Sequence, residues 1–584
     1  MIDDILLQVN KPGRYIGREW NVPAKEFKKA GVRFALVFPD LYEVGMSNLG
    51  IRIIYGLLNS IDDVSCERFF SCEPDMENIL RKNSLGNLSL ETASPFREFD
   101  IAGFSLGSEL DYTNVLNILD LNSVPLESRL RENSHPLIIA GGPCVLNPEP
   151  MHEFFDLFII GEAEEAVLEL IGLYREHQEE FKQGALSRQE LLLLLAQVEG
   201  VYAPSLYEVK YNAEGKIEEF RPKVEGAPLK IKKRFAANFD SAFFPLEWLV
   251  PYIQIIHDRV TLEVMRGCPN SCRFCQARSC YYPLREKKAE NLLKMAQELC
   301  RRTGYEEISL SGLSVSDYSQ VQELICGLVG LFKEKGVAVS LPSIKPGSAV
   351  GGFSSLIAGT KKTGLTFAPE AGTVRLRNVL GKDFREGDFF SGLSQAYAAG
   401  YQHVKLYFML GLPSEREEDL EAIIDFAQRV SNHRKNMNPA PARVNISINA
   451  LIPKPHTPMQ WFAMEGPAAI KEKQDYLKNR AKNRRLVFSF HNRDMSFLEG
   501  VLSRGDRRLS RVILAAFKQG ARFDAWGNRF SFEKWRSAFQ ECGIDPCLYL
   551  EERSRAEFLP WDFIDVGISK RALAEEFNKI LAQI

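Results

Sequence analysis

The chain has 584 residues, well above the roughly 250–300 residues at which a single hydrophobic core stops growing, so about three domains are expected. Its 45% hydrophobic and 26% charged residues exclude a disordered or fibrous protein. The 73 Lys and Arg nearly balance the 76 Asp and Glu, and the resulting net charge of −3 excludes a global attraction to nucleic acid or to an anionic membrane. Any such partner must be bound locally.

The first residues, Met-Ile-Asp-Asp, do not form a positive segment followed by an apolar stretch, so no secretory signal is predicted. The purest apolar run, residues 191–196, is much shorter than the ~20 residues that span a bilayer. We therefore expect a cytoplasmic protein with no membrane partner. In a reducing compartment its 11 cysteines should be thiols or metal ligands rather than disulfides.

The N-terminal part alternates strand-like and helical segments. Strands are predicted at residues 32–38, 101–104, 136–140 and 157–160, with a helix from about Met46. Glycine-rich turns follow the last two strands, at Gly141-Gly142-Pro143 and at Gly161-Glu-Ala-Glu. This pattern indicates an open doubly wound α/β domain over residues 1–170, with its ligand crevice at the carboxyl ends of the strands. Residues 171–250 are expected to form a bridging helix and linker.

Three cysteines, Cys268, Cys272 and Cys275, stand in a C-x3-C-x2-C spacing directly after a strand-like run at residues 260–265. Three thiolates in one tight loop repel each other, and an iron–sulfur cube relieves the repulsion while one iron keeps no protein ligand. Such an open iron binds substrate. The alternative is a structural zinc site or a fully ligated cluster with Cys280 as the fourth ligand.

Further strands are predicted downstream of the cysteines, with helical stretches between them, at residues 308–310, 337–341, 365–367, 403–408 and 444–448. Alternating β and α units favour a parallel sheet, here a partial β/α barrel over residues 251–465 whose strand carboxyl ends carry the chemistry. The cysteines follow the first strand at that end.

A Pro-Lys-Pro-His-Thr-Pro stretch follows the last of these strands, and it contains His456. This histidine is either an acid or base, or a hydrogen-bonded loop residue. The remaining residues, 466–584, are predicted to form a helix-rich C-terminal extension or cap. It contains basic segments at residues 471–485 and 503–511 and aromatic residues, which fit either RNA binding or a solvated amphipathic helix.

The cysteine motif, with Phe274 before its last cysteine, resembles the cluster signature of radical S-adenosylmethionine (SAM) enzymes. The resemblance implies a 4Fe–4S cluster held by Cys268, Cys272 and Cys275. It also implies that SAM chelates the fourth iron and that reductive cleavage yields methionine and a 5′-deoxyadenosyl radical. An external electron donor of the flavodoxin or ferredoxin class would supply the electron.

The same resemblance implies the SAM-binding positions. The turn at 309–314, with Ser311 and Gly312, matches a Gly-Gly-Glu-type turn but lacks its Glu. Glu370 would bind the ribose hydroxyls, Arg375 would bind a carboxylate, and Gly411 opens a Gly-Leu-Pro turn beside the adenine. The resemblance leaves the residues that act on the substrate unknown.

The N-terminal half resembles the cobalamin-binding domain that precedes the barrel in one branch of these enzymes. The implied cofactor positions are Asp40, Gly45, Gly141 and Gly142. Where related domains place a histidine below the cobalt, this chain has Tyr42. Either cobalamin binds without a lower protein ligand, or the domain has kept its fold and lost the cofactor.

Taken together, the chain resembles an uncharacterised family of radical SAM proteins with an N-terminal cobalamin-binding-like domain. The resemblance covers nearly the whole chain and implies methylation, methylthiolation-like chemistry or cobalamin-free hydrogen abstraction. We expect the target to be a macromolecule, RNA or protein. The alternative is a non-catalytic or redox-sensing iron–sulfur scaffold.

Overall fold

The computed structural model describes residues 2–340 and 365–584. The N-terminal part forms a six-stranded sheet with the order β2-β1-β3-β4-β5-β6, parallel except for the β5–β6 pair. β1 and β2 are buried along almost their whole length, as expected of parallel strands covered on both faces. The strands are β1 (Val32–Phe38), β2 (Val64–Phe70), β3 (Ile101–Ser105), β4 (Leu137–Gly141), β5 (Leu157–Ile159) and β6 (Val201–Tyr202).

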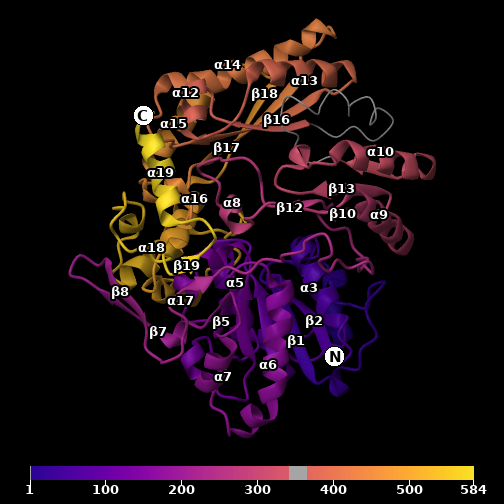
Figure 1. The fold of residues 1–584 in the computed structure, drawn as a ribbon, viewed down its shortest axis with the longest axis vertical. Helices are drawn as coiled ribbons and strands as arrows, with labels where there is room; N and C mark the ends of the chain where they lie inside the picture. Colours follow the sequence, from indigo (N-terminus) through magenta and orange to yellow (C-terminus); the bar gives the residue numbers. More distant parts are fainter. Residues whose placement is uncertain (1, 341–364) are drawn as a thin grey trace.

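Helices α3 (Leu49–Asn59), α5 (Tyr112–Leu121) and α6 (Ala163–Gln183) accompany this sheet (Figure 1). α3 begins at an N-cap, because the Asn48 side chain accepts a hydrogen bond from the backbone N–H of Ile51. Its apolar face contacts β2, and α3 also contacts α6. The doubly wound arrangement predicted from the sequence is confirmed.

Two further parallel sheets make up the central part, in the orders β10-β13-β14 and β15-β16-β17-β18. The N-terminal sheet lies below them in Figure 1. Along β16, alternate residues from Val404 to Leu410 are buried in one hydrophobic cluster with side chains of α13 (Glu386–Ala398) and α14 (Glu417–His433). The residues between them face the other side of the sheet and are half-buried. The strands are β10 (Val260–Glu263), β13 (Glu307–Ser311), β14 (Ala338–Ser340), β15 (Leu365–Glu370), β16 (His403–Leu410), β17 (Arg443–Ala450) and β18 (Leu486–Phe490).

These sheets confirm the predicted central strands, although residue 341 of the third predicted strand lies outside the described residues. In the three larger sheets, β2, β6 and β18 were not predicted. β2 is the edge strand of the N-terminal sheet, and β18 pairs in parallel with β17 although it lies beyond residue 465, where the barrel was expected to end. The residues assigned to the C-terminal extension therefore complete the central sheet.

The remaining extension forms α15 (Pro467–Arg480), α16 (Arg493–Arg504), α17 (Leu509–Lys518), α18 (Phe532–Glu541) and α19 (Lys570–Leu581). The extension was expected to cap the barrel, but side chains of α16 and α17 belong to the same hydrophobic cluster as the N-terminal sheet. Hydrogen bonds add to this contact, because Ser510 Oγ donates to the Pro150 carbonyl over 2.9 Å. The extension and the N-terminal domain thus share one core.

The bridging segment also ties the two ends of the chain together. It contains α7 (Arg188–Leu195) and the hairpin of β7 (Tyr207–Tyr211) and β8 (Ile217–Pro222). A short strand at its end, β9 (Ile231–Lys232), pairs in parallel with β19 (Ile564–Asp565). Among the described residues, no helix is long and apolar enough to cross a membrane.

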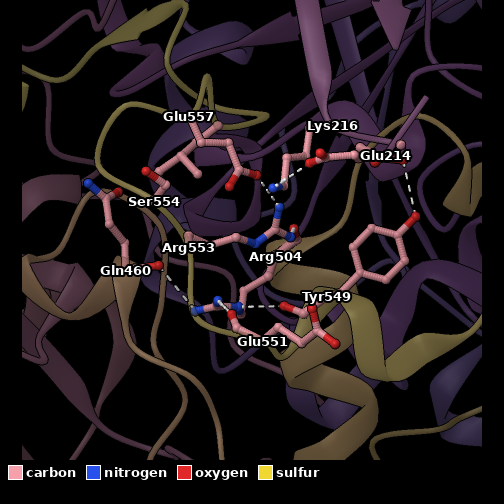
Figure 2. Close-up of polar contacts among 12 residues, drawn as sticks. Glu214, Lys216, Gln460, Arg504, Tyr549, Glu551, Arg553, Ser554 and Glu557 are labelled. Carbon is pink, nitrogen blue, oxygen red and sulfur yellow. Dashed lines mark hydrogen bonds and ion pairs between the residues drawn. The ribbon is translucent and has the colours of Figure 1, made fainter. Parts of the chain in front are cut away.

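Arg504 joins the extension to the proline-rich loop (Figure 2). Its side chain is fully buried at the end of α16, and burial lowers its pKa to about 9. Its guanidinium donates to the carbonyls of Tyr549 (2.7 Å), Pro453 (3.1 Å), Gln460 (3.2 Å) and Glu551 (2.9 Å). Arg504 therefore joins α16 to two other backbone segments, and among the residues that the structure describes it forms no ion pair.

Candidate functional site

The three cysteines lie on one loop between β11 (Met265–Arg266) and β12 (Arg285–Glu286), which pair in antiparallel fashion. Gly267 opens this loop with φ of +85°, and a Cβ there would stand 2.7 Å from the Leu284 Cα. Only glycine fits that closure. Cys268, Cys272 and Cys275 are half-buried free thiols that line one cavity of about 280 Å³.

Burial raises the pKa of Cys272 to about 11 and also raises the pKa of Cys275. Negative charge on the neighbouring cysteines acts in the same direction, whereas Lys382 lowers the pKa of Cys272. Three thiolates are therefore unfavourable here without a metal. No group of three His, Cys, Asp or Glu side chains in the described parts of the chain is arranged to hold a metal ion. A cube binds each thiolate to a different iron and so holds them farther apart than a single ion does.

Asn270 places its amide beside the cysteines. Its Nδ2 lies 3.4 Å from Cys268 Sγ and donates to Asp317 Oδ2 over 2.8 Å. An amide donor beside a thiolate sulfur stabilises the charged, metal-binding form. The chemistry and placement of this donor set fit an iron–sulfur cluster.

Cys280, the alternative fourth ligand, stands apart from this cavity. It lies at the end of the short helix α8 (Gln276–Cys280) and is not among the residues that line the cysteine cavity. Burial raises its pKa to about 11. The geometry thus gathers three cysteines at the cavity rather than four.

The cavity also contains Glu370, the predicted ribose-binding carboxylate, at the end of β15. Its φ of +69° is uncommon for a residue with a side chain, and burial raises its pKa. Lys382 Nζ lies 3.5 Å from Glu370 Oε1 and lines the same wall. Sequence reasoning missed Lys382, because a single lysine in a loop carries no pattern.

Two further predicted SAM contacts, Arg375 and Gly411, are not among the residues that line this cavity. Arg375 pairs with Asp419 and donates to Ser414, so its guanidinium is already engaged at the start of α14. Gly411 follows β16 with φ of +77°, and its N–H donates to Glu415 Oε2 over 2.9 Å. Both residues shape the turn after β16 in this structure.

A second cavity, of about 500 Å³, lies between the N-terminal sheet and the central part, and we call it the interdomain cavity. Its floor comes from the carboxyl ends of β3, β4 and β5, and its roof comes from those of β10 and β13. Gly142, predicted to contact cobalamin, lines it, and so do Ser311 and Gly312, which were predicted to contact SAM. Leu313, the next residue, lines both cavities and leaves 42% of its surface exposed. The turn at 311–314 therefore separates two adjacent chambers.

The glycines near the interdomain cavity have different structural roles. A Cβ on Gly142 would lie 2.6 Å from the Leu106 carbonyl oxygen, and its φ is +106°, so the turn itself requires glycine. Gly141 ends β4 just before it. Gly107 has no positive φ, and a Cβ there would meet nothing within 4 Å. Its missing side chain leaves the cavity open, which the sequence did not indicate.

Asp40, Tyr42 and Gly45, which follow β1, are not among the residues that line the interdomain cavity. Tyr42 is buried and its hydroxyl donates to Glu19 Oε1 over 2.8 Å. Asp40 accepts a hydrogen bond of 2.9 Å from Trp526 Nε1, and burial raises the pKa of Asp40. A Cβ on Gly45 would lie 2.2 Å from the Phe70 ring. Asp40, Tyr42 and Gly45 thus serve packing and contact with the C-terminal extension.

His456 is also internal. It is buried, its Nε2 lies 3.1 Å from the Leu146 carbonyl oxygen, and burial lowers its pKa to about 4. At neutral pH it is an uncharged imidazole bound to backbone, so the structure favours the hydrogen-bonded loop residue.

The two basic segments are largely paired. Arg507 binds Glu149 and Arg508 binds Asp506, whereas Arg480 on α15 lies 3.1 Å from Glu421. Arg484 and Arg485 are exposed, but they precede β18 at the amino end of its sheet. The cysteine cavity lies toward the carboxyl ends of the strands.

Comparison with known proteins places these features in a family. A family model described as radical SAM proteins, N-terminal, matches residues 50–204, and one for the radical SAM superfamily matches residues 262–427. An uncharacterized protein, MJ0966 of Methanocaldococcus jannaschii, is 28% identical over 515 residues, covering 87% of this chain and 97% of the relative.

Two solved structures have a partly similar fold. One is the radical SAM methyltransferase TsrM from Kitasatospora setae with cobalamin and a 4Fe–4S cluster, with a TM-score of 0.47 and 12% identity over 74% of this chain and 77% of that one. The other is the cobalamin-dependent SAM radical enzyme OxsB with aqua-cobalamin and SAM, with a TM-score of 0.49 and 14% identity over 94% and 80%. The two matched family ranges together span more than half of the chain and include the three cysteines. The chain belongs to the radical SAM superfamily and is a radical SAM enzyme.

Proposed function

We propose that this enzyme cleaves SAM reductively at a 4Fe–4S cluster held by Cys268, Cys272 and Cys275, and that it binds cobalamin in the interdomain cavity for methyl transfer. The observation that carries this proposal is Leu313, which lines both the cysteine cavity and the interdomain cavity. Two cofactors that act on one substrate must reach it from adjacent chambers.

The cysteine cavity supports the first half of the proposal. Three thiols surround it, Asn270 supplies an amide donor, and Cys280 is not at its wall. A cluster bound by three cysteines supplies one electron, from an external donor of the flavodoxin or ferredoxin class, to break a carbon–sulfur bond of SAM. Glu370 and Lys382 stand where they would orient the bound SAM by hydrogen bonds to its polar groups.

The interdomain cavity supports the second half. It lies at the carboxyl ends of parallel strands, where open α/β sheets bind their ligands. Gly107 keeps backbone exposed on its wall, and no histidine is among the residues that line it. Gly107 and Gly142 on this wall would let the backbone approach cobalamin, which would supply the methyl group to be transferred.

Methyl transfer is preferred to methylthiolation-like chemistry because the second chamber adjoins the first. The target stays predicted as a macromolecule, RNA or protein. The basic segments of the C-terminal extension support a macromolecular target less than the sequence suggested, since Arg507 and Arg508 are already paired with Glu149 and Asp506.

Equilibrium dialysis against hydroxocobalamin tests the proposal. The wild-type chain should bind it. Tyr42→Phe should bind equally, because the Tyr42 hydroxyl donates to Glu19 and Tyr42 does not line the interdomain cavity. Gly107→Val should bind at least about tenfold more weakly, because a side chain at this wall position would occupy space in the cavity. Equal iron content in all three proteins is the control. Undetectable binding by the wild type would show that the N-terminal domain has become structural.

A further inference from the structure

The loop that carries the three cysteines is closed at its base by two arginines. Arg266 and Arg285 stand directly opposite each other in the β11–β12 ladder, which is only two residues long on each side. All three cysteines lie between them, and Cys268 is two residues from Arg266. So short a ladder contributes few backbone hydrogen bonds, and the loop needs further support to keep one shape.

Both arginines bind the same carboxylate of the N-terminal domain. Glu162, in the Gly-Glu-x-Glu turn between β5 and α6, lies 3.0 Å from Arg266 Nη1 and accepts a 2.8 Å hydrogen bond from Arg285 Nη1. Arg266 also binds Glu164 of that turn and Glu263 of β10. The contact therefore crosses from the N-terminal sheet to both ends of the cysteine loop.

These groups are shielded from water. The side chains of Glu162 and Arg266 are each 8% exposed, and that of Arg285 is 10% exposed. The Phe239 ring of the linker packs under three cations, at 4.9 Å from Arg266, 5.9 Å from Arg285 and 4.4 Å from Lys287. Arg266 and Arg285 pair with the carboxylates of Glu162, Glu164 and Glu263, whereas Lys287 Nζ donates to the Phe239 carbonyl. Loss of one buried partner leaves an uncompensated charge, so this arrangement is held firmly.

We propose that Glu162, Arg266 and Arg285 form an interdomain clamp by which the N-terminal domain fixes the geometry of the cysteine loop. Glu162 is then a positioning residue for the iron–sulfur cluster. Glu162 and Arg266 also line the interdomain cavity, and the positioning role adds to that placement because it follows from the ion pairs to the cysteine loop.

Hydrogen–deuterium exchange of the full cluster-free chain tests the clamp. In Glu162→Gln, amides of residues 268–284 should exchange about tenfold faster than in the wild type, while amides of β3 and β4 change by less than about twofold. Glu165→Gln is the matched control, because Glu165 lies in the same helical turn but pairs with Arg234 at the surface, and it should leave the loop unchanged. Arg285→Gln leaves the ion pairs of Arg266 intact and should accelerate amide exchange in the same loop to a smaller extent. This variant replaces Glu162→Gln in the test if Glu162→Gln does not fold.

A second readout follows the cluster. At equal iron content, the reduced cluster of Glu162→Gln should give an altered electron paramagnetic resonance spectrum, whereas Glu165→Gln should match the wild type. Loop exchange within twofold of the wild type in Glu162→Gln would overturn the proposal. Uniform acceleration across the N-terminal sheet would also overturn it, because that result describes general destabilisation rather than positioning.

Discussion

Side chains that look reactive in the sequence are often used for packing in this molecule. Tyr42 stands at a position where related domains have a metal ligand, yet its hydroxyl binds Glu19, which pairs in turn with the buried Arg68. Arg375 is held by Asp419. The cysteines differ because three of them are free thiols that share one cavity wall.

His456 makes the stability of the protein depend on acid. Its folded pKa of about 4 lies below its ordinary value of 6.5, so the unfolded chain takes up a proton between those values and the folded chain does not. Stability is therefore fully present above pH 6.5 and falls as the pH drops toward 4, by up to about 3 kcal/mol from this group.

Thermal melting at pH 7 and pH 5 should accordingly show a smaller acid-induced loss in His456→Gln than in the wild type. The loss should not vanish, because burial and the nearby Arg507 lower the pKa of His152 to about 3. An identical loss in both proteins would mean that His456 titrates normally in the folded state.

At the scale of elements, the buried Arg504 joins α16 to two other segments by hydrogen bonds to their carbonyls. Arg504→Met should leave four carbonyls in two segments without this donor and lower stability by about 3 kcal/mol. Urea unfolding followed by tryptophan fluorescence should show a midpoint lower by about 1 M, since Trp461 and Trp561 are buried in the same region. The exposed Arg484→Met is the control and should leave the midpoint unchanged; equal effects of the two substitutions would contradict this role of Arg504.

The elements that the sequence predicted are those with continuous apolar runs, such as β1, β3 and β16. β2 was not predicted because the charged residues Glu67 and Arg68 interrupt its apolar pattern. Arg68 is nevertheless buried, since it pairs with Glu19 and Glu91. β18 follows a basic segment and is short. β2 pairs with β1 and β18 pairs with β17, and such parallel pairing is not visible in the periodicity of either segment.

Of the candidate site, the sequence predicted the cysteine ligands but not the residues that separate elements bring to the cavities. Cysteine spacing indicates the cluster because all three ligands lie on one loop. Lys382 and Gly107 could not be found in this way, since each reaches its cavity only through the packing of separate elements. Glu162 was visible as part of a turn, but its pairing with two arginines of the cysteine loop depends on how the two domains dock.

At the scale of the whole molecule, the N-terminal domain supports the central sheets from two directions. It shares a hydrophobic core with the C-terminal helices, and it holds the cysteine loop through the interdomain clamp. The two cavities meet at Leu313 between these contacts. This architecture predicts that the iron–sulfur chemistry depends on the intact chain.

The most direct test of the account is the formation of 5′-deoxyadenosine from SAM by the anaerobically reconstituted and chemically reduced enzyme. The wild type should bind about four irons per chain and form the product, and Cys280→Ala should do the same because Cys280 is not at the cluster wall. Cys272→Ala should lose both iron and product. Absence of 5′-deoxyadenosine from a wild type that holds four irons, or a loss of iron in Cys280→Ala equal to that in Cys272→Ala, would contradict the three-cysteine site with an open iron.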